Sequence, residues 1–162
     1  MSELSHLDEA GAARMVDVSA KTATSRTALA GGTLRTTAEV LGLLVANGLP
    51  KGDALATARI AGIMGAKRTP ELIPLCHQIA LSGVDIEFEL GEAEIHIRAT
   101  ARTTDRTGVE MEALTAVAVT GLTLHDMIKA VDPAATLDAV QLIRKDGGKH
   151  GTWTRPEGRE RA

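Results

Sequence analysis

The sequence predicts an α+β fold, a ferredoxin-like antiparallel sheet with helices packed on one of its faces. Residues 84–102 alternate apolar and polar side chains around a Gly91-Glu92 turn, the pattern of a β-hairpin with one buried and one solvated face. Helical segments at 53–67 and 109–131 flank this hairpin in the sequence. Segregated helices on an antiparallel sheet define the α+β class.

The chain begins with weak signals. Residues 1–14 are polar with scattered charge, and we expect a flexible N-terminus there. Short strands are expected at 15–18 and at 26–34. Within the second strand, Gly31-Gly32 indicates a bulge or a close approach of another backbone.

Two helices are expected next. The first begins at a capping box formed by Thr36 and Glu39, and it ends at the helix-stop pair Asn47-Gly48. The second runs over 53–67. Its interior is rich in Ala and Gly, so we expect another backbone to pack closely against it.

Capping signals also mark the later helices. Thr69 followed by Pro70 predicts an N-cap and the first helical position of one short turn. Thr107 and Glu110 form a second capping box, which opens the long helix over 109–131. Asp-Pro follows that helix and ends it.

The chain closes with a strand at 137–143 and a flexible basic loop at 145–151. Residues 152–162 are expected to form a flexible tail. There is no internal repeat and no convincing linker, so the sequence predicts a single domain over 15–151.

The composition argues against several classes of protein. The chain has 162 residues, 44% of them hydrophobic, which suits one globular domain. A net charge of −3 and only two aromatic residues, Phe88 and Trp153, disfavour binding to nucleic acid or anionic membrane. No apolar signal region or membrane span is visible, and the single Cys76 fits a reducing compartment. We expect a cytoplasmic protein.

Segment 67–77 (KRTPELIPLCH) has two interpretations. Lys67 and Arg68 can complement the C-terminal end of a helix while Cys76 packs as a small buried hydrophobe. Alternatively, Leu75 to His77 form a rigid pocket wall in which the imidazole offers a hydrogen bond or a proton. The adjacent Cys and His point to opposite faces of an extended chain, which argues against a shared metal.

Lys51 and the pair Asp126–Lys129 also leave alternatives open. Lys51 precedes a helix N-terminus, where it forms either part of an anion site or a solvated loop lysine. Asp126 and Lys129 share a helix face, which fits a simple salt bridge or a carboxylate base beside a lysine acid.

Spacing along the long helix limits how these groups can combine. The capping box accounts for Glu110, but nothing local accounts for Glu112. Glu112 and Asp126 are 14 positions apart, which places them about 21 Å apart along the axis. One small ligand cannot contact both in a single chain. We therefore expect either that only one belongs to the site, or that the site lies between subunits, which we favour.

Several segments resemble the family of cyclic pyranopterin monophosphate synthases, molybdenum cofactor biosynthesis protein C (the MoaC family). The resemblance covers nearly the whole chain from residue 15 to residue 151, and words such as IPLCH and TGVEMEALTA are too long for chance. The segments are MVDVSAKTATSRTALAGG (15–32), KGDALATARIAGIMGAKRTPELIPLCH (51–77), TGVEMEALTAVAVTGLTLHDMIKAVD (107–132) and the closing KDGGKHG (145–151).

The resemblance implies a ferredoxin-like subunit in a homohexamer, a trimer of dimers, with active sites at subunit interfaces. It implies a lyase that converts 3′,8-cyclo-7,8-dihydro-GTP, a small purine triphosphate derivative, into cyclic pyranopterin monophosphate and pyrophosphate. By position it assigns catalysis to Lys51, Asp126 and Lys129. It assigns substrate contacts to Leu75, Cys76, His77, Met111 and Glu112, with Arg26, Lys67 and Lys145 as further contacts to phosphate or purine.

Other functions remain open from sequence alone. A non-catalytic ligand-binding oligomer can use the same scaffold, since fold does not fix function. A metal-dependent purine-nucleotide cyclohydrolase is disfavoured because the five histidines and one cysteine are scattered. We expect no metal site and no required cofactor, with Mg²⁺ as an open companion of the substrate phosphates.

Overall fold

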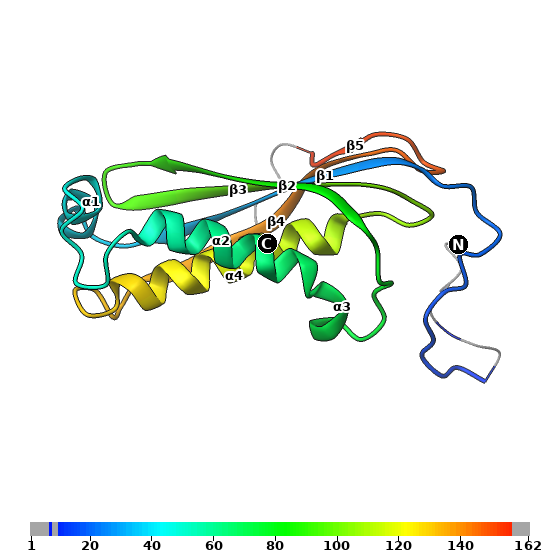
Figure 1. Ribbon diagram of the computed structural model, residues 1–162, viewed down its shortest axis with the longest axis horizontal. Coiled ribbons are helices and arrows are strands. Elements are labelled where there is room, and N and C mark those ends of the chain that lie inside the picture. The colour runs from blue at the N-terminus through cyan, green and yellow to red at the C-terminus, as the bar shows by residue number, and fades with distance from the viewer. Residues whose placement is uncertain (1–6, 8–9, 157–162) are drawn as a thin grey trace.

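A five-stranded sheet organises the protein, as the computed structural model shows for residues 7 and 10–156 (Figure 1). The strand order is β2-β3-β1-β4-β5, and every neighbouring pair is antiparallel. The strands are β1 (Thr24–Arg35), β2 (Leu81–Leu90), β3 (Glu94–Asp105), β4 (Thr136–Asp146) and β5 (Trp153–Thr154).

The helices lie on one face of this sheet (Figure 1). They are α1 (Ala38–Val45), α2 (Ala54–Lys67), α3 (Thr69–Leu72) and α4 (Glu110–Ile128). α2 and α4 pack against each other, and α4 also contacts β1, β3 and β4. Without the short α1, α3 and β5, the order is βαββαβ, which confirms the predicted ferredoxin-like α+β fold.

The core fills the space between the sheet and the two long helices. On β3, alternate residues such as Ile95 and Ile97 are at most 1% exposed, while their neighbours face away from the helices. From α4, Val117 and Leu124 are fully buried in the same core cluster. The predicted hairpin of β2 and β3 is confirmed, and its alternation places one face in the core.

Close packing of α2 on α4 depends on small residues, as the Ala- and Gly-rich interior of α2 predicted. A Cβ atom at Gly62 would overlap Thr120 Oγ1 and would lie 3.0 Å from the Ala116 carbonyl oxygen. Gly65 lies in the same way against Val119. The helices can therefore approach closely only with glycine at these positions.

The predicted irregularity at Gly31-Gly32 is also confirmed. The pairing of β1 with β4 shifts register between Leu29 and Ala30 and again between Gly31 and Thr33. The pairing of β1 with β3 stays regular over the same residues. The irregularity at these residues therefore concerns the side of β1 that faces β4 and not the side that faces β3.

Two predicted caps are wrong by one position. Thr37, not Thr36, caps α1, because Thr37 is extended and its hydroxyl accepts a hydrogen bond from the Val40 amide. Thr69 lies inside α3 and not at its N-cap. Its hydroxyl donates to the Ala66 carbonyl, since α3 follows α2 almost without a break.

The second predicted capping box, Thr107 with Glu110, does not form. α4 has Val109 at its N-cap and no side-chain cap hydrogen bond. Glu110 is the first helical residue, too early to reach back to a cap. Its carboxylate instead lies 3.0 Å from Lys145 Nζ.

The segments at the two ends of the chain also differ from expectation. Residues 15–18 form no strand, because no partner strand lies beside them. Of residues 1–14, only 7 and 10–14 belong to the described part, with an isolated bridge between Leu7 and Ala13. β5 pairs with Arg144 and Lys145 in what we expected to be a tail, and residues 157–162 lie outside the described residues.

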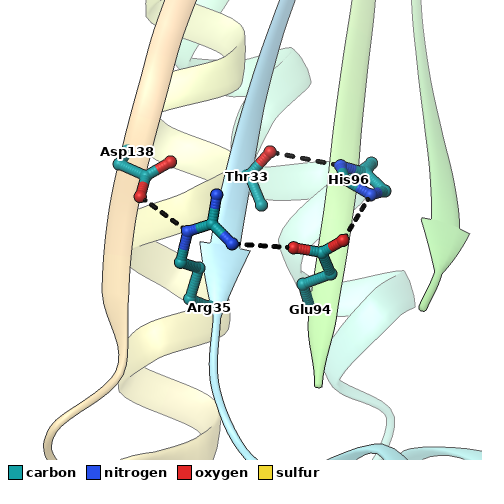
Figure 2. A network of polar contacts seen from close by, with 5 residues as sticks. All are labelled: Thr33, Arg35, Glu94, His96 and Asp138. Carbon is teal, nitrogen blue, oxygen red and sulfur yellow. Dashed lines mark hydrogen bonds and ion pairs between the residues drawn. The ribbon is translucent and has the colours of Figure 1, made fainter. Parts of the chain in front are cut away.

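On the sheet face away from the helices, an ionic network ties the end of β1 to both neighbouring strands (Figure 2). Arg35 Nε lies 2.9 Å from Asp138 on β4, and its terminal nitrogen lies 3.0 Å from Glu94 on β3. Glu94 also contacts His96, whose other ring nitrogen lies 3.1 Å from Thr33 Oγ1. The network fixes where the chain leaves the sheet for α1.

Candidate active site

A lysine–carboxylate cluster lies at the C-terminal end of α4. Lys51 Nζ and Lys129 Nζ each lie 2.7 Å from a different carboxylate oxygen of Asp126. Lys51 Nζ also donates to the Asp126 backbone carbonyl at 3.0 Å. The structure thus brings together three residues from two distant parts of the sequence.

The local sequence explains how Lys51 reaches this position. Leu49 lies in the loop between α1 and α2, and its side chain is buried. The Gly52 amide donates to the Leu49 carbonyl in a tight turn. Gly52 has φ of +87°, a value that favours glycine. Asp53 then caps α2 through the Ala56 amide, and Lys51 projects from the turn toward α4.

The cluster has a strong electrostatic effect on its carboxylate. Hydrogen bonds from Lys129 and Lys51 lower the pKa of Asp126 to about 2. Asp126 is therefore ionised at neutral pH and does not act there as a resting proton donor. The cluster holds an anion that orients two ammonium groups.

A second group of candidate residues lines a cleft of about 350 Å³ at the opposite end of α4. Its wall combines the loop after α3 with the first turn of α4. The candidates that line it are Leu75, Cys76, His77, Met111 and Glu112.

Burial sets the chemistry of two groups in this cleft. Glu112 is only 3% exposed, and desolvation raises its pKa to about 7, with a further contribution from Glu110. Burial also raises the pKa of the Cys76 thiol, and the Glu112 carboxylate adds to the increase. Glu112 can therefore exchange a proton near neutral pH, whereas Cys76 stays a thiol.

His77 has a contact that the sequence did not reveal. Its Nε2 lies 2.6 Å from the Val16 carbonyl oxygen, which can only accept, so Nε2 carries the proton. This bond holds the segment after residue 15 against the cleft, where Val16, Val18 and Lys21 join its lining. Nothing in the sequence of residues 15–18 (MVDV) indicates that this segment contacts His77 and lines the cleft.

The third group lies in an adjoining basic cleft of about 580 Å³. Arg26 donates to the backbone carbonyls of Asp105 and Arg106, which fixes its guanidinium. Lys145 faces Glu110 in the same cleft. Further basic residues that sequence reasoning did not select complete the lining, namely Lys21, Arg106, Lys149 and His150.

The two clefts form one continuous region, because both are lined by Lys21, Thr107, Gly108 and Glu110. Neither is lined by Lys51, Asp126 or Lys129. Lys67 is exposed at the end of α2 and lines neither cleft. Apart from Lys67, the candidate residues of one chain therefore lie in two separate places.

Within residues 7 and 10–156, no three His, Cys, Asp or Glu side chains gather as a potential metal site. No helix in this part of the chain is long and apolar enough to cross a membrane.

The fold and these groups define an α+β protein with acid–base residues and a basic cleft, a combination suited to chemistry on an anionic ligand. The sequence model of the MoaC family matches residues 15–148. The chain belongs to the MoaC family.

Curated relatives agree over almost the full length. The chain is 65% identical over 153 residues to "Cyclic pyranopterin monophosphate synthase 2" of Mycobacterium tuberculosis H37Rv, covering 94% of this chain and 92% of the relative. It is 61% identical over 152 residues to the Streptomyces coelicolor "Cyclic pyranopterin monophosphate synthase", covering 94% and 89%. The Corynebacterium efficiens protein of the same name is 54% identical over 154 residues, covering 95% and 99%.

Proposed function

We propose that this protein is a lyase of molybdenum cofactor biosynthesis that makes cyclic pyranopterin monophosphate. Its substrate is 3′,8-cyclo-7,8-dihydro-GTP, and pyrophosphate is the second product. Membership of the MoaC family and 65% identity to a relative named for this product support the assignment. The observation that carries it is the contact of Lys51 and Lys129 with one Asp126 carboxylate, each at 2.7 Å.

The cluster supplies proton transfer for opening the imidazole ring and closing the new ring. Asp126 remains ionised because its pKa is about 2, so its role is to orient and stabilise the two ammonium groups. Lys51 and Lys129 then donate and accept protons at the substrate. In this mechanism Asp126 is not the base, unlike the alternative in which the Asp126 carboxylate acts as a base beside a lysine acid.

The two clefts supply the remaining contacts. The purine occupies the cleft beside Glu112, whose pKa of about 7 suits proton exchange near neutral pH. The triphosphate occupies the basic cleft, where Arg26 and Lys145 offset its charge and that of the departing pyrophosphate. With only two aromatic side chains in the sequence, apolar and backbone contacts hold the purine.

A complete active site requires two chains. Asp126 and Glu112 lie at opposite ends of α4, about 21 Å apart along the helix axis. The Lys51 cluster of one subunit therefore faces the clefts of another, in a homohexamer built as a trimer of dimers. This arrangement lets one substrate contact both groups.

The reaction needs no resident metal or organic cofactor, because lysines and carboxylates supply the proton transfers and basic side chains offset the phosphate charge. We place it in the cytoplasm. The single cysteine, which needs no oxidising environment, supports this location.

The test is an assay of the purified protein with fresh 3′,8-cyclo-7,8-dihydro-GTP, following pyrophosphate and the oxidised pterin together. Equal release of both products supports the synthase. Pyrophosphate without pterin would identify a hydrolase instead. Binding without turnover would identify a ligand-binding protein.

A further inference from the structure

Asp132 is a nearly buried carboxylate that lies just after α4. It is 9% exposed. One oxygen accepts a hydrogen bond from the Ala134 amide at 3.1 Å. The other accepts from the Thr36 hydroxyl at 2.7 Å, across 96 positions of sequence. Both oxygens of this buried group are therefore satisfied by specific partners.

Both partners belong to segments that lead to the lysine–carboxylate cluster. Thr36 lies between β1 and α1, and the chain after α1 carries Lys51. Asp132 follows Lys129 by three positions, and its amide donates to the Ile128 carbonyl in the closing turn of α4. In Figure 1, α1 and the turn after α4 lie at the same end of the molecule.

The ion pairs of the cluster orient its ammonium groups, but they cannot alone fix the spacing of the two chain segments that carry them. The side chains of Lys51, Asp126 and Lys129 are 43%, 52% and 54% exposed. Ion pairs between such exposed groups add little stability and restrict long side chains only weakly. Helix ends also open locally at low cost. The relative position of the three groups must therefore come from the backbone that carries them.

Thr36 is a firm anchor for that backbone. Its amide donates to the Ala93 carbonyl at 2.9 Å. The preceding residue, Arg35, is fixed between Glu94 and Asp138 (Figure 2). The hydrogen bond from the Thr36 hydroxyl to Asp132 thus ties the end of α4 to a rigid part of the sheet.

We propose that Thr36 and Asp132 are positioning residues for the reaction, since their hydrogen bond holds the last turn of α4 and the Lys51 loop in the arrangement that catalysis requires. This inference rests on the proposed function. Neither residue touches the cluster, so the hydrogen bond acts through Lys51 and Lys129. Loss of this hydrogen bond leaves the substrate clefts unchanged, but it lets the distance between Lys51 and Lys129 vary.

The test compares three variants in the synthase assay at a temperature where each is folded by circular dichroism. Thr36→Val removes the hydroxyl and keeps the shape, and Thr36→Ser returns the hydroxyl. Thr103→Val is the matched control, because it removes a buried threonine hydroxyl bond, to the Ala80 carbonyl, away from the cluster. Asp132→Ala, which removes the acceptor of the Thr36 hydroxyl, replaces Thr36→Val if that variant does not fold, and the same loss of kcat is expected of it.

We expect kcat to fall at least fivefold in Thr36→Val with KM within twofold, and to recover in Thr36→Ser. Thr103→Val should lose thermal stability and keep kcat. An unchanged kcat in Thr36→Val, or an equal loss in Thr103→Val, would overturn the inference. A wild-type protein without turnover would instead overturn the proposed function, so the two failures are distinguishable.

Discussion

Lys51 Nζ lies 2.7 Å from a carboxylate oxygen of Asp126 and 3.0 Å from its backbone carbonyl oxygen, although 75 positions separate the two residues. Both side chains are about half exposed, so the pair adds little to the stability of the fold. A long-range contact with little structural value is best explained by the chemistry it supports.

Lys51→Ala and Asp126→Asn should each lower kcat at least about a hundredfold, because in the proposed mechanism Lys51 transfers a proton and Asp126 orients the two ammonium groups. The free energy of unfolding, measured in urea, should change by less than about 1 kcal/mol in each variant, as expected for the loss of an exposed ion pair. Asp85→Asn is the control, since it breaks an exposed pair with Arg102 on the sheet. Equal activity of Asp126→Asn and wild type would contradict the assignment.

Glu112 should make the stability of the protein depend on pH. Its pKa is raised from 4.5 to about 7 in the folded state, so the folded chain binds a proton more tightly than the unfolded chain. The contribution of Glu112 to the free energy of unfolding is then complete below pH 4.5, and this contribution is lost as the pH rises toward and past 7. The loss should be up to about 3 kcal/mol at pH 8.

Glu112→Gln should remove this dependence, because an amide of the same shape does not titrate. Chemical denaturation at pH 4.5 and at pH 8 measures the difference. We expect the variant to be more stable than the wild type at pH 8, and the gap to close at pH 4.5. A wild-type stability that stays flat between these values would show that Glu112 is not desolvated as the structure indicates.

A site shared between subunits predicts complementation of two inactive variants. Lys51→Ala damages the cluster and Glu112→Gln damages the cleft. When the two are denatured, mixed in equal amounts and refolded together, about a quarter of the shared sites receive two intact halves. We expect recovery of a comparable share of wild-type activity in the synthase assay.

Each variant refolded alone is the control, and it should stay inactive. A mixture that also remains inactive, despite subunit exchange shown by native mass spectrometry, would mean that each chain contains its own complete site. The same spectra report whether the assembly is a hexamer.

Close packing of the helices predicts opposite effects for two Gly→Ala substitutions. Gly62→Ala should destabilise the protein by about 1–3 kcal/mol, because its methyl group would overlap Thr120 and Ile86. Gly42→Ala should stabilise it by up to about 1 kcal/mol, since this position in α1 has open space. Thermal unfolding of both variants checks the pair, and a neutral Gly62→Ala would contradict the packing.

Activity should survive removal of divalent metal ions, because in the proposed mechanism lysines supply the proton transfers while Arg26 and Lys145 offset the phosphate charge. The measurement is turnover after dialysis against excess EDTA, beside the same sample with added Mg²⁺. Retention of at least half the activity is expected. Complete loss that Mg²⁺ restores would assign the metal an essential role with the substrate phosphates.

The main elements could be predicted because their signals are local. Alternating side chains define β2 and β3, and a run of small and apolar residues after Asp53 defines α2. The errors concern polar side chains whose partners are distant in sequence. Thr36 resembles a helix cap but bonds to Asp132, and Glu110 resembles a capping-box residue but pairs with Lys145.

The candidate site shows the same limit. The spacing of Asp126 and Lys129 predicts their shared face, and α4 brings them into contact as expected. Nothing near Lys51 in the sequence reveals that its loop turns toward α4. The bond from His77 to the Val16 carbonyl was equally hidden, because a backbone acceptor leaves no pattern in the sequence.

The length of α4 has a consequence for natural variation in this protein. One inserted or deleted residue would shift one end of the helix by about 1.5 Å and rotate it by about 100° relative to the other. Asp126 and Glu112 would then no longer present their side chains in the directions that the proposed shared site requires. Substitutions at exposed positions such as Leu122 carry no such penalty. Exposed positions of this helix outside the candidate site can therefore vary, but the proposed shared site requires a fixed number of residues between its two ends.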